Sequence, residues 1–200
     1  MRDKLKFKIG LALGLLILPL SAVQAADIST HTSAGCAFPD TAQSISYATA
    51  FGDDADYATT ASTMSFTIHN GVDWGGTATS SVTVDNRTGL MWVTDPVDAG
   101  ISNTYTWQNA LAACENLAYA GFSDWRLPNI RELVSIVDYN RQNPAINTRY
   151  FPKTTTSGYW SATTCVPNPG SAWAVSFSYG KMYSTNKPYY YYVRCVRGGP

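Results

Sequence analysis

The sequence is poor in the residue types on which most catalytic and metal sites depend. Charged residues make up 14% of its 200 residues, and it contains only two histidines and four cysteines. His31 and His69 stand alone, and no Cys-x-x-Cys or paired Cys/His spacing of the kind that holds zinc is present. Both histidines precede the part of the chain that we expect to form the core, so a Ser-His-Asp triad cannot be assembled. These absences argue against an enzyme.

Long apolar runs are equally scarce. The single one, residues 9–20, is twelve residues long, well short of the roughly 20 that a membrane-spanning helix needs. Four basic residues precede it and Val23-Gln24-Ala25 follows as a small-residue cleavage site, so residues 1–25 are predicted to be a secretory signal peptide. We therefore expect a bacterial protein that is secreted, periplasmic or held at the cell surface, with no membrane insertion after signal cleavage.

The charges are unevenly distributed along the chain. Residues 27–125 contain one basic and 11 acidic residues, whereas residues 126–200 contain nine basic and two acidic ones. The basic half could present a cationic surface to an anionic ligand, or the two halves could pack together and neutralise each other. The second interpretation is favoured for a single domain, and no nucleic-acid partner is expected.

Abundant tyrosine, tryptophan, threonine, serine and glycine indicate a loop-rich domain with short strands rather than a helical bundle. In the last predicted strand, an inward-pointing Cys195 would place Val193 and Tyr191 on the same face. Tyr190, Tyr192 and Arg194 would then lie on the other face. Alternating apolar residues predict strands at 65–68, 81–84, 90–93, 159–162, 172–177, 181–184 and 189–197.

Two helices are predicted between these strands. Thr106 is a suitable N-cap for a helix over 107–119, whose apolar residues follow helical spacing and put Cys114 on the buried face. In the second helix, Asn129 and Glu132 have the spacing of a capping box. The buried face of that helix is predicted to consist of Ile130, Leu133, Val134 and Val137.

An exported chain with four cysteines is expected to contain two disulfides, for which three pairings exist. Asp53, Asp54 and Asp56 place three carboxylates within four residues, and such oxygens can bind Ca²⁺. This cluster lacks the spacing and the distal Glu of an EF-hand loop, and mutually repelling acids on a loop are usually solvated. We therefore expect no cofactor, with Ca²⁺ at this cluster as the alternative.

A set of motifs between residues 88 and 199 carries a family resemblance. The motifs are Thr88-Gly-Leu-Met-Trp92, Trp107 with Cys114 and Leu117, Gly121-Phe-Ser-Asp-Trp-Arg-Leu-Pro128, Glu132-Leu133, Tyr159-Trp-Ser161, Ala172-Trp173 and Tyr192-Val-Arg-Cys-Val-Arg-Gly-Gly199. In combination they resemble the Lcl C-terminal domain family, which includes the C-terminal domain of a bacterial collagen-like surface adhesin and many secreted proteins of unknown function. Residues 38–57 resemble the segments that precede this domain in relatives.

The resemblance implies an α+β fold similar to C-type lectins and formylglycine-generating enzymes, with two helices, short twisted antiparallel sheets and two disulfides. Residues 81–200 would form this domain, with an irregular segment, residues 26–80, packed on it. In such folds a first-helix cysteine bonds the final strand, which implies Cys114–Cys195 and leaves Cys36–Cys165 as the second pair. The corner between the helices is expected to be structural, with Arg126 bonding Asp124 or backbone carbonyls. Its residues are Asp124, Trp125, Arg126, Pro128 and Glu132.

Several features of these relatives are missing. No collagen-like Gly-x-y repeat precedes the domain. Pro167-Asn168-Pro169 lacks the acid of the Glu-Pro-Asn or Gln-Pro-Asp loop through which C-type lectins chelate sugars with calcium. With all four cysteines in disulfides, none would remain for the oxidation that formylglycine-generating enzymes perform. A catalyst of that kind is therefore the third hypothesis.

The leading hypothesis is a secreted, non-catalytic binding module that recognises an extracellular glycan. The adhesin relative suggests a sulfated polysaccharide, since Lys and Arg match sulfate groups and Tyr and Trp provide rigid contact area. Alternatively, the tyrosines only cover a small half-buried sheet, or the domain is a protein-binding, lectin-like receptor diversified by a retroelement. The candidate ligand residues are Trp173, Tyr179, Lys181, Tyr183, Lys187, Tyr189, Tyr190, Tyr192 and Arg194.

Overall fold

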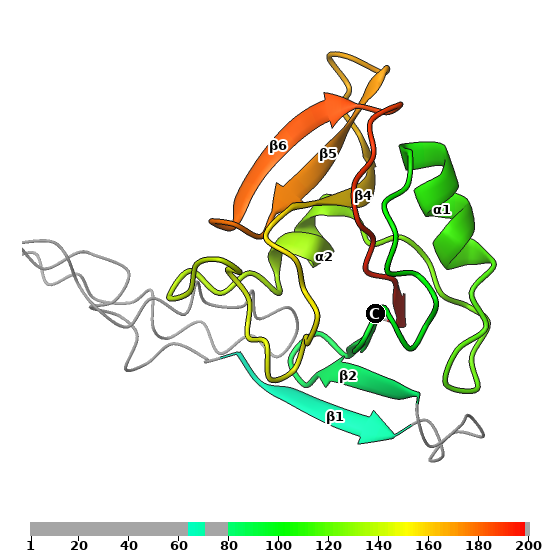
Figure 1. Cartoon of the computed structure of the whole chain (residues 1–200), viewed down its shortest axis with the longest axis vertical. Coiled ribbons are helices and arrows are strands. Elements are labelled where there is room, and N and C mark those ends of the chain that lie inside the picture. Colours follow the sequence, from blue (N-terminus) through cyan, green and yellow to red (C-terminus); the bar gives the residue numbers. More distant parts are fainter. Residues whose placement is uncertain (1–63, 71–79, 199–200) are drawn as a thin grey trace, which may run out of the picture. The chain divides into compact units, whose positions relative to one another are not determined.

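The computed structural model describes residues 64–70 and 80–198 and has an α+β fold (Figure 1). Three strands of a first antiparallel sheet come first, two short helices follow, then the three strands of a second antiparallel sheet, and the last strand returns to the first sheet. The elements are β1 (Phe66–Asn70), β2 (Ser81–Asp85), β3 (Leu90–Val93), α1 (Trp107–Glu115), α2 (Ile130–Val134), β4 (Gly158–Thr164), β5 (Ser171–Ser176), β6 (Lys181–Asn186) and β7 (Val196–Gly198). No helix in the described ranges is long and apolar enough to cross a membrane.

The first sheet joins the end of the described chain to its beginning. Its strand order is β1-β2-β3-β7, so the last strand pairs with residues that precede it by about a hundred positions. The β2–β3 turn is stabilised by Asp85, whose carboxylate accepts from Arg87 N at 3.0 Å and Thr88 Oγ1 at 2.7 Å. Gly89 completes the turn with φ +70°, a conformation that favours glycine.

The second sheet is formed by three consecutive strands in the order β4-β5-β6. The β5–β6 hairpin turns at Gly180, where φ is +72° and an added Cβ would collide with Val137. The register across the hairpin pairs Ala174 with Tyr183 and Trp173 with Ser184. Residues paired in this way lie on the same face, so Trp173 and Tyr183 lie on opposite faces of the sheet.

Both predicted helix starts are confirmed. The Thr106 hydroxyl caps α1 by accepting from Asn109 N at 3.5 Å. Asn129 and Glu132 form the complete capping box of α2: Asn129 Oδ1 accepts from Glu132 N at 3.0 Å and Glu132 Oε2 accepts from Asn129 N at 2.8 Å. These bonds satisfy N–H groups that a helix leaves without partners in its first turn.

The predicted extent of α1 was wrong. The helix ends at Glu115 with Asn116 as its cap, rather than at residue 119. The chain then reverses in a tight turn, in which Tyr119 and Phe122 exchange both backbone hydrogen bonds. Ala120 and Gly121 adopt positive φ values of 53° and 82° there. This local pairing competes with another helical turn.

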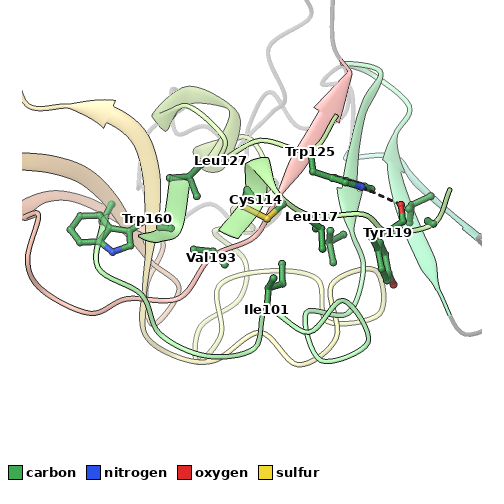
Figure 2. Close-up of a cluster of buried hydrophobic side chains, with 14 of the residues drawn as sticks. Ile101, Cys114, Leu117, Tyr119, Trp125, Leu127, Trp160 and Val193 are labelled. Carbon is green, nitrogen blue, oxygen red and sulfur yellow. Dashed lines mark hydrogen bonds between the residues drawn. A yellow bond between two sulfur atoms is a disulfide. The ribbon is translucent and has the colours of Figure 1, made fainter. Parts of the chain in front are cut away.

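The core consists of two clusters of buried side chains. The first surrounds the Cys114–Cys195 disulfide and includes Trp125 and Trp160 (Figure 2). The second lies around Phe151, with Trp92 packed edge-on to it at a centroid distance of 6.4 Å. The disulfide confirms the predicted pairing and closes a loop of 81 residues. A cross-link that closes a loop of this length is expected to stabilise the folded protein by about 4 kcal/mol in the chain-entropy picture.

The predicted long last strand was also wrong. Only Val196–Gly198 forms a strand, while the preceding residues make single bridges with different partners. Tyr191 pairs with Tyr105, and Tyr192 pairs in parallel with Tyr159. The backbone groups of this segment bond first Tyr105, just before α1, and then Gly158 and Trp160 of β4, instead of following one strand.

Several predictions fall on residues outside the described ranges. They are the signal peptide (1–25), most of the irregular segment (26–80) and the acidic cluster Asp53, Asp54 and Asp56. Cys165 is a buried free thiol in this structure. Its predicted partner Cys36 also lies outside the described residues, so that pairing stays a prediction.

Replacing Gly158 by alanine is expected to destabilise the second sheet. An added Cβ would collide with the Tyr183 hydroxyl and the Tyr191 ring. Because both tyrosines are packed against neighbouring side chains, the free energy of unfolding should fall by about 1–3 kcal/mol. Gly170→Ala is the matched control, since its nearest contact would be Asn168 Oδ1 at 3.4 Å. Urea unfolding measures both, and equal midpoints for the two variants would contradict this expectation.

Candidate functional site

The nine candidate ligand residues do not form one surface. Lys181 and Lys187 flank β6 at its two ends, and a rise of about 3.4 Å per residue separates them by about 20 Å. Trp173 is half-buried on the opposite face of the sheet from Tyr183. The candidates therefore have to be considered in smaller groups.

At one end of the sheet, Lys187 is held in place by three other segments. Its Nζ lies 3.9 Å from the centroid of the Trp107 ring and donates to Thr164 Oγ1 at 3.0 Å. Its backbone N–H donates to Gly170 O, and its carbonyl accepts from Trp107 N, both at 3.0 Å. Tyr189 and Tyr190 follow after Pro188 and are 56% and 66% exposed. We call Trp107, Lys187, Tyr189 and Tyr190 the aromatic–basic surface.

At the other end, the β5–β6 turn exposes a second group of large side chains. Tyr179 is 67% exposed, and Lys181 is exposed at the start of β6. Tyr139 packs against this turn, and its hydroxyl donates to Gly180 O at 3.4 Å. Tyr139 and Met182 are each about half exposed.

Tyr183 contributes to packing rather than to an open surface. Its ring meets Tyr191 at a centroid distance of 6.0 Å, and Tyr191 packs edge-on to Trp160 at 5.0 Å. Burial, followed by the hydrogen bond with Tyr191, raises the pKa of Tyr183 above its ordinary value of 10.0. The neutral phenol is therefore the form that this site stabilises.

The expectation that Arg194 faces a ligand was wrong, because its side chain is completely buried. Its Nη1 donates to the carbonyls of Val93 and Thr94, both at 2.8 Å. Its Nη2 donates to Thr154 Oγ1 at 2.7 Å. Alternation correctly places Arg194 opposite Cys195, but both sides of this segment pack inside the protein. Burial lowers the pKa of Arg194, while Tyr159 and Asp95 oppose that shift.

Tyr192 lies apart from the other candidates, in the wall of a cavity of about 350 Å³. Three parts of the chain line this cavity: Pro96, Val97 and Ser102; residues 153–155 with Tyr159; and residues 192–193. The Tyr192 ring stacks on Tyr159 with a centroid distance of 5.5 Å and an interplanar angle of 29°. Sequence reasoning missed this cavity, because its walls come from segments with no common motif.

The corner between the helices agrees with expectation only in part. Arg126 forms a bidentate pair with Glu132, with distances of 2.7 and 2.8 Å, rather than bonding Asp124. Its Nη2 also donates to the backbone carbonyl of Gly198 at 3.3 Å, which agrees with the expected bond to a carbonyl. Asp124 instead pairs with Arg197 at 2.6 and 3.0 Å, and this contact lowers the pKa of the Asp124 carboxyl. The corner is thereby linked to the last strand.

These ion pairs bear on whether the acidic and basic halves of the chain neutralise each other. Glu132 and Asp138 are the two acids of the basic half, and they pair with Arg126 and Arg141 of the same half. Only the Asp124–Arg197 pair joins the acidic half to the basic one among the described ion pairs. In the described ranges no group of three His, Cys, Asp or Glu side chains comes together to hold a metal ion.

The fold and these contacts define a small α+β domain whose first helix is bonded to its last segment by a disulfide. The chain belongs to the Lcl C-terminal domain family, whose model matches residues 81–197. The match extends from the start of β2 into β7 and includes both core clusters almost entirely. No curated protein matches the chain.

Replacing Arg194 by lysine should destabilise the protein although the charge is kept. A lysine cannot reproduce the planar set of bonds to the two carbonyls and Thr154, so buried acceptors would lose their donors. We expect the free energy of unfolding to fall by about 2–4 kcal/mol. Arg141→Lys, in a pair whose arginine side chain is 49% exposed, is the control and should cost less than about 1 kcal/mol. Equal losses in urea unfolding would contradict the structural role of Arg194.

Tyr183 should make the protein less stable at alkaline pH. Its folded-state pKa is raised, so the folded protein keeps a proton that the unfolded chain loses above about pH 10. The stabilisation from Tyr183 is thus present below that pH and is lost as the pH rises further. Tyr183→Phe should show a flatter decline of unfolding free energy from about pH 9 to about pH 11. Tyr179→Phe, at an exposed position, should keep the wild-type profile, and a wild-type profile for Tyr183→Phe would refute the prediction.

Proposed function

We propose that this protein is a secreted, non-catalytic binding module that recognises an extracellular glycan, with a sulfated polysaccharide as the preferred ligand. The C-type-lectin-like architecture and the second disulfide belong to the same proposal. Two helices, small antiparallel sheets and a disulfide from the first helix to the last segment support that architecture.

The aromatic–basic surface is the observation that carries this proposal. Lys187 is positioned by Trp107 and Thr164 before any ligand arrives, so little side-chain entropy remains to be lost on binding. Its partners are an aromatic ring and a hydroxyl, and neither neutralises the ammonium charge. Tyr189 and Tyr190, two and three positions further along the chain, have exposed side chains. A fixed cation together with exposed aromatic side chains suits a sulfate group carried on a sugar.

Uncompensated positive charge elsewhere in the basic half supports an anionic ligand. Arg131, Arg149, Lys153 and Lys181 form no ion pair with a carboxylate in the described part of the chain. Such charges attract a polyanion over several ångströms and are screened by salt. Binding should therefore weaken as the ionic strength rises.

A second candidate function is recognition of a protein, favoured by the exposed group at the other end of the sheet. Tyr139, Tyr179 and Met182 expose apolar area around the β5–β6 turn. Tyrosine and methionine are both enriched at protein interfaces. This alternative predicts salt-insensitive binding of a protein ligand.

Binding of the purified protein to immobilised sulfated and neutral glycans, at low and high salt, tests the proposal. We expect salt-sensitive binding to sulfated chains that falls about tenfold or more in Lys187→Ala, since a hydrogen bond to a charged group contributes about 1.5–3 kcal/mol. Arg131→Ala removes the same charge from an exposed position in α2 and should weaken glycan binding much less. Failure to bind any sulfated glycan, or equal losses in the two variants, would contradict the proposal.

A further inference from the structure

The cavity beside Tyr192 has the size and lining of a small-molecule site. Its volume of about 350 Å³ lies near the lower end of the range of roughly 300–1,000 Å³ in which proteins bind small ligands. Apolar walls come from Pro96, Val97 and Val193, and an aromatic wall comes from the Tyr159–Tyr192 stack. Such a space accommodates one ring rather than a chain of rings.

All three walls of the cavity are tied to the buried guanidinium of Arg194. The Val93 and Thr94 carbonyls that it bonds lead directly into the first wall, which begins at Pro96. Thr154, which it also bonds, belongs to the second wall. Arg194 itself directly follows Val193, which belongs to the third wall. The walls are therefore fixed before a ligand enters, which lowers the entropic cost of binding.

Charge at the cavity favours an anion. Lys153 is the one charged residue among the described residues that line it. Arg194 lies directly behind Thr154, and its Nε has no hydrogen-bond partner among the described groups. Asp95 interacts electrostatically with Arg194, but it does not line the cavity. Its Oδ1 accepts a hydrogen bond from Val97 N at 2.8 Å.

The backbone conformation of Lys153 is an independent indication that this cavity has a function. Its φ is +55°, a left-handed conformation that glycine and asparagine adopt far more easily than lysine. The side chain is exposed, so core packing does not account for lysine at this position. A strained backbone at a cavity is a reason to infer function from the side chain that it displays.

We propose that this cavity binds a single sugar acid, with the Lys153 ammonium pairing with the carboxylate and the Tyr192 ring packing against the sugar ring. The hydroxyls of Ser102 and Thr155 in the lining offer partners for the sugar hydroxyls. This site is separate from the aromatic–basic surface and recognises one residue of an acidic glycan rather than the charge along its length. The choice of a sugar acid rests on the proposed glycan-binding function.

Calorimetric titration with sodium glucuronate, glucose and sodium acetate tests this proposal. We expect saturable binding of glucuronate and much weaker binding of the other two compounds. Lys153→Gly should weaken glucuronate binding about tenfold or more. The melting temperature of this variant should be no lower than that of the wild type, because glycine relieves the left-handed backbone. Lys153→Arg should retain most of the binding, and Arg131→Ala should match the wild type.

These results test the proposed cavity site independently of whether the protein binds a sulfated polysaccharide. Unchanged glucuronate affinity in Lys153→Gly, or no glucuronate binding by the wild type, would overturn the proposed site. Acetate bound as tightly as glucuronate would overturn recognition of a sugar ring. Glucuronate binding that depends on Lys153, in a protein that binds no sulfated polysaccharide, would support the cavity and reject the proposed function of the aromatic–basic surface.

Discussion

A buried arginine has to find hydrogen-bond acceptors inside the protein, and this requirement organises the structure. Transferring an unpaired guanidinium from water into a protein interior would cost several kcal/mol. Arg194 avoids much of that cost by bonding the carbonyls at the end of β3 and the hydroxyl of Thr154. The strand that it bonds and the loop that contains Thr154 are about sixty residues apart in the sequence. This side chain, together with the packing of Trp92 on Phe151, holds the two segments in position, while Cys195, the next residue, is covalently bonded to α1.

Local signals in the sequence predicted a large part of this fold. The capping box of α2 depends on residues three positions apart, and the hairpin strands depend on alternation within six residues. Such interactions are complete within a short stretch of chain. Two predictions failed for different reasons: α1 stops early because a tight turn forms at residues 119–122, whereas the last strand is broken up by contacts with distant segments. Tyr191 and Tyr192 bond residues 105 and 158–160, which no local pattern reveals.

The site was less predictable than the fold. Alternation separates two faces of a segment, but it does not say whether the second face meets solvent or another part of the core, and Arg194 illustrates that difference. Aromatic and basic composition drew attention to Lys187, Tyr189 and Tyr190, which lie within four positions of the chain, and their role in binding stays a prediction. Composition gave no indication of the cavity, since the left-handed backbone of Lys153 and the approach of its three walls exist only in the folded chain.

The loop that carries Tyr189 and Tyr190 is shaped almost entirely by backbone hydrogen bonds. Lys187 bonds Gly170 and Trp107 through its main chain, Tyr189 N donates to Asn186 O, and Tyr191 exchanges two bonds with Tyr105. The exposed side chains at positions 189 and 190 can therefore change with little effect on the conformation of the loop. Under the proposed function, substitution at these two positions would alter ligand recognition at small cost in stability. Natural variants of this domain could thus diverge in specificity while keeping the same stability.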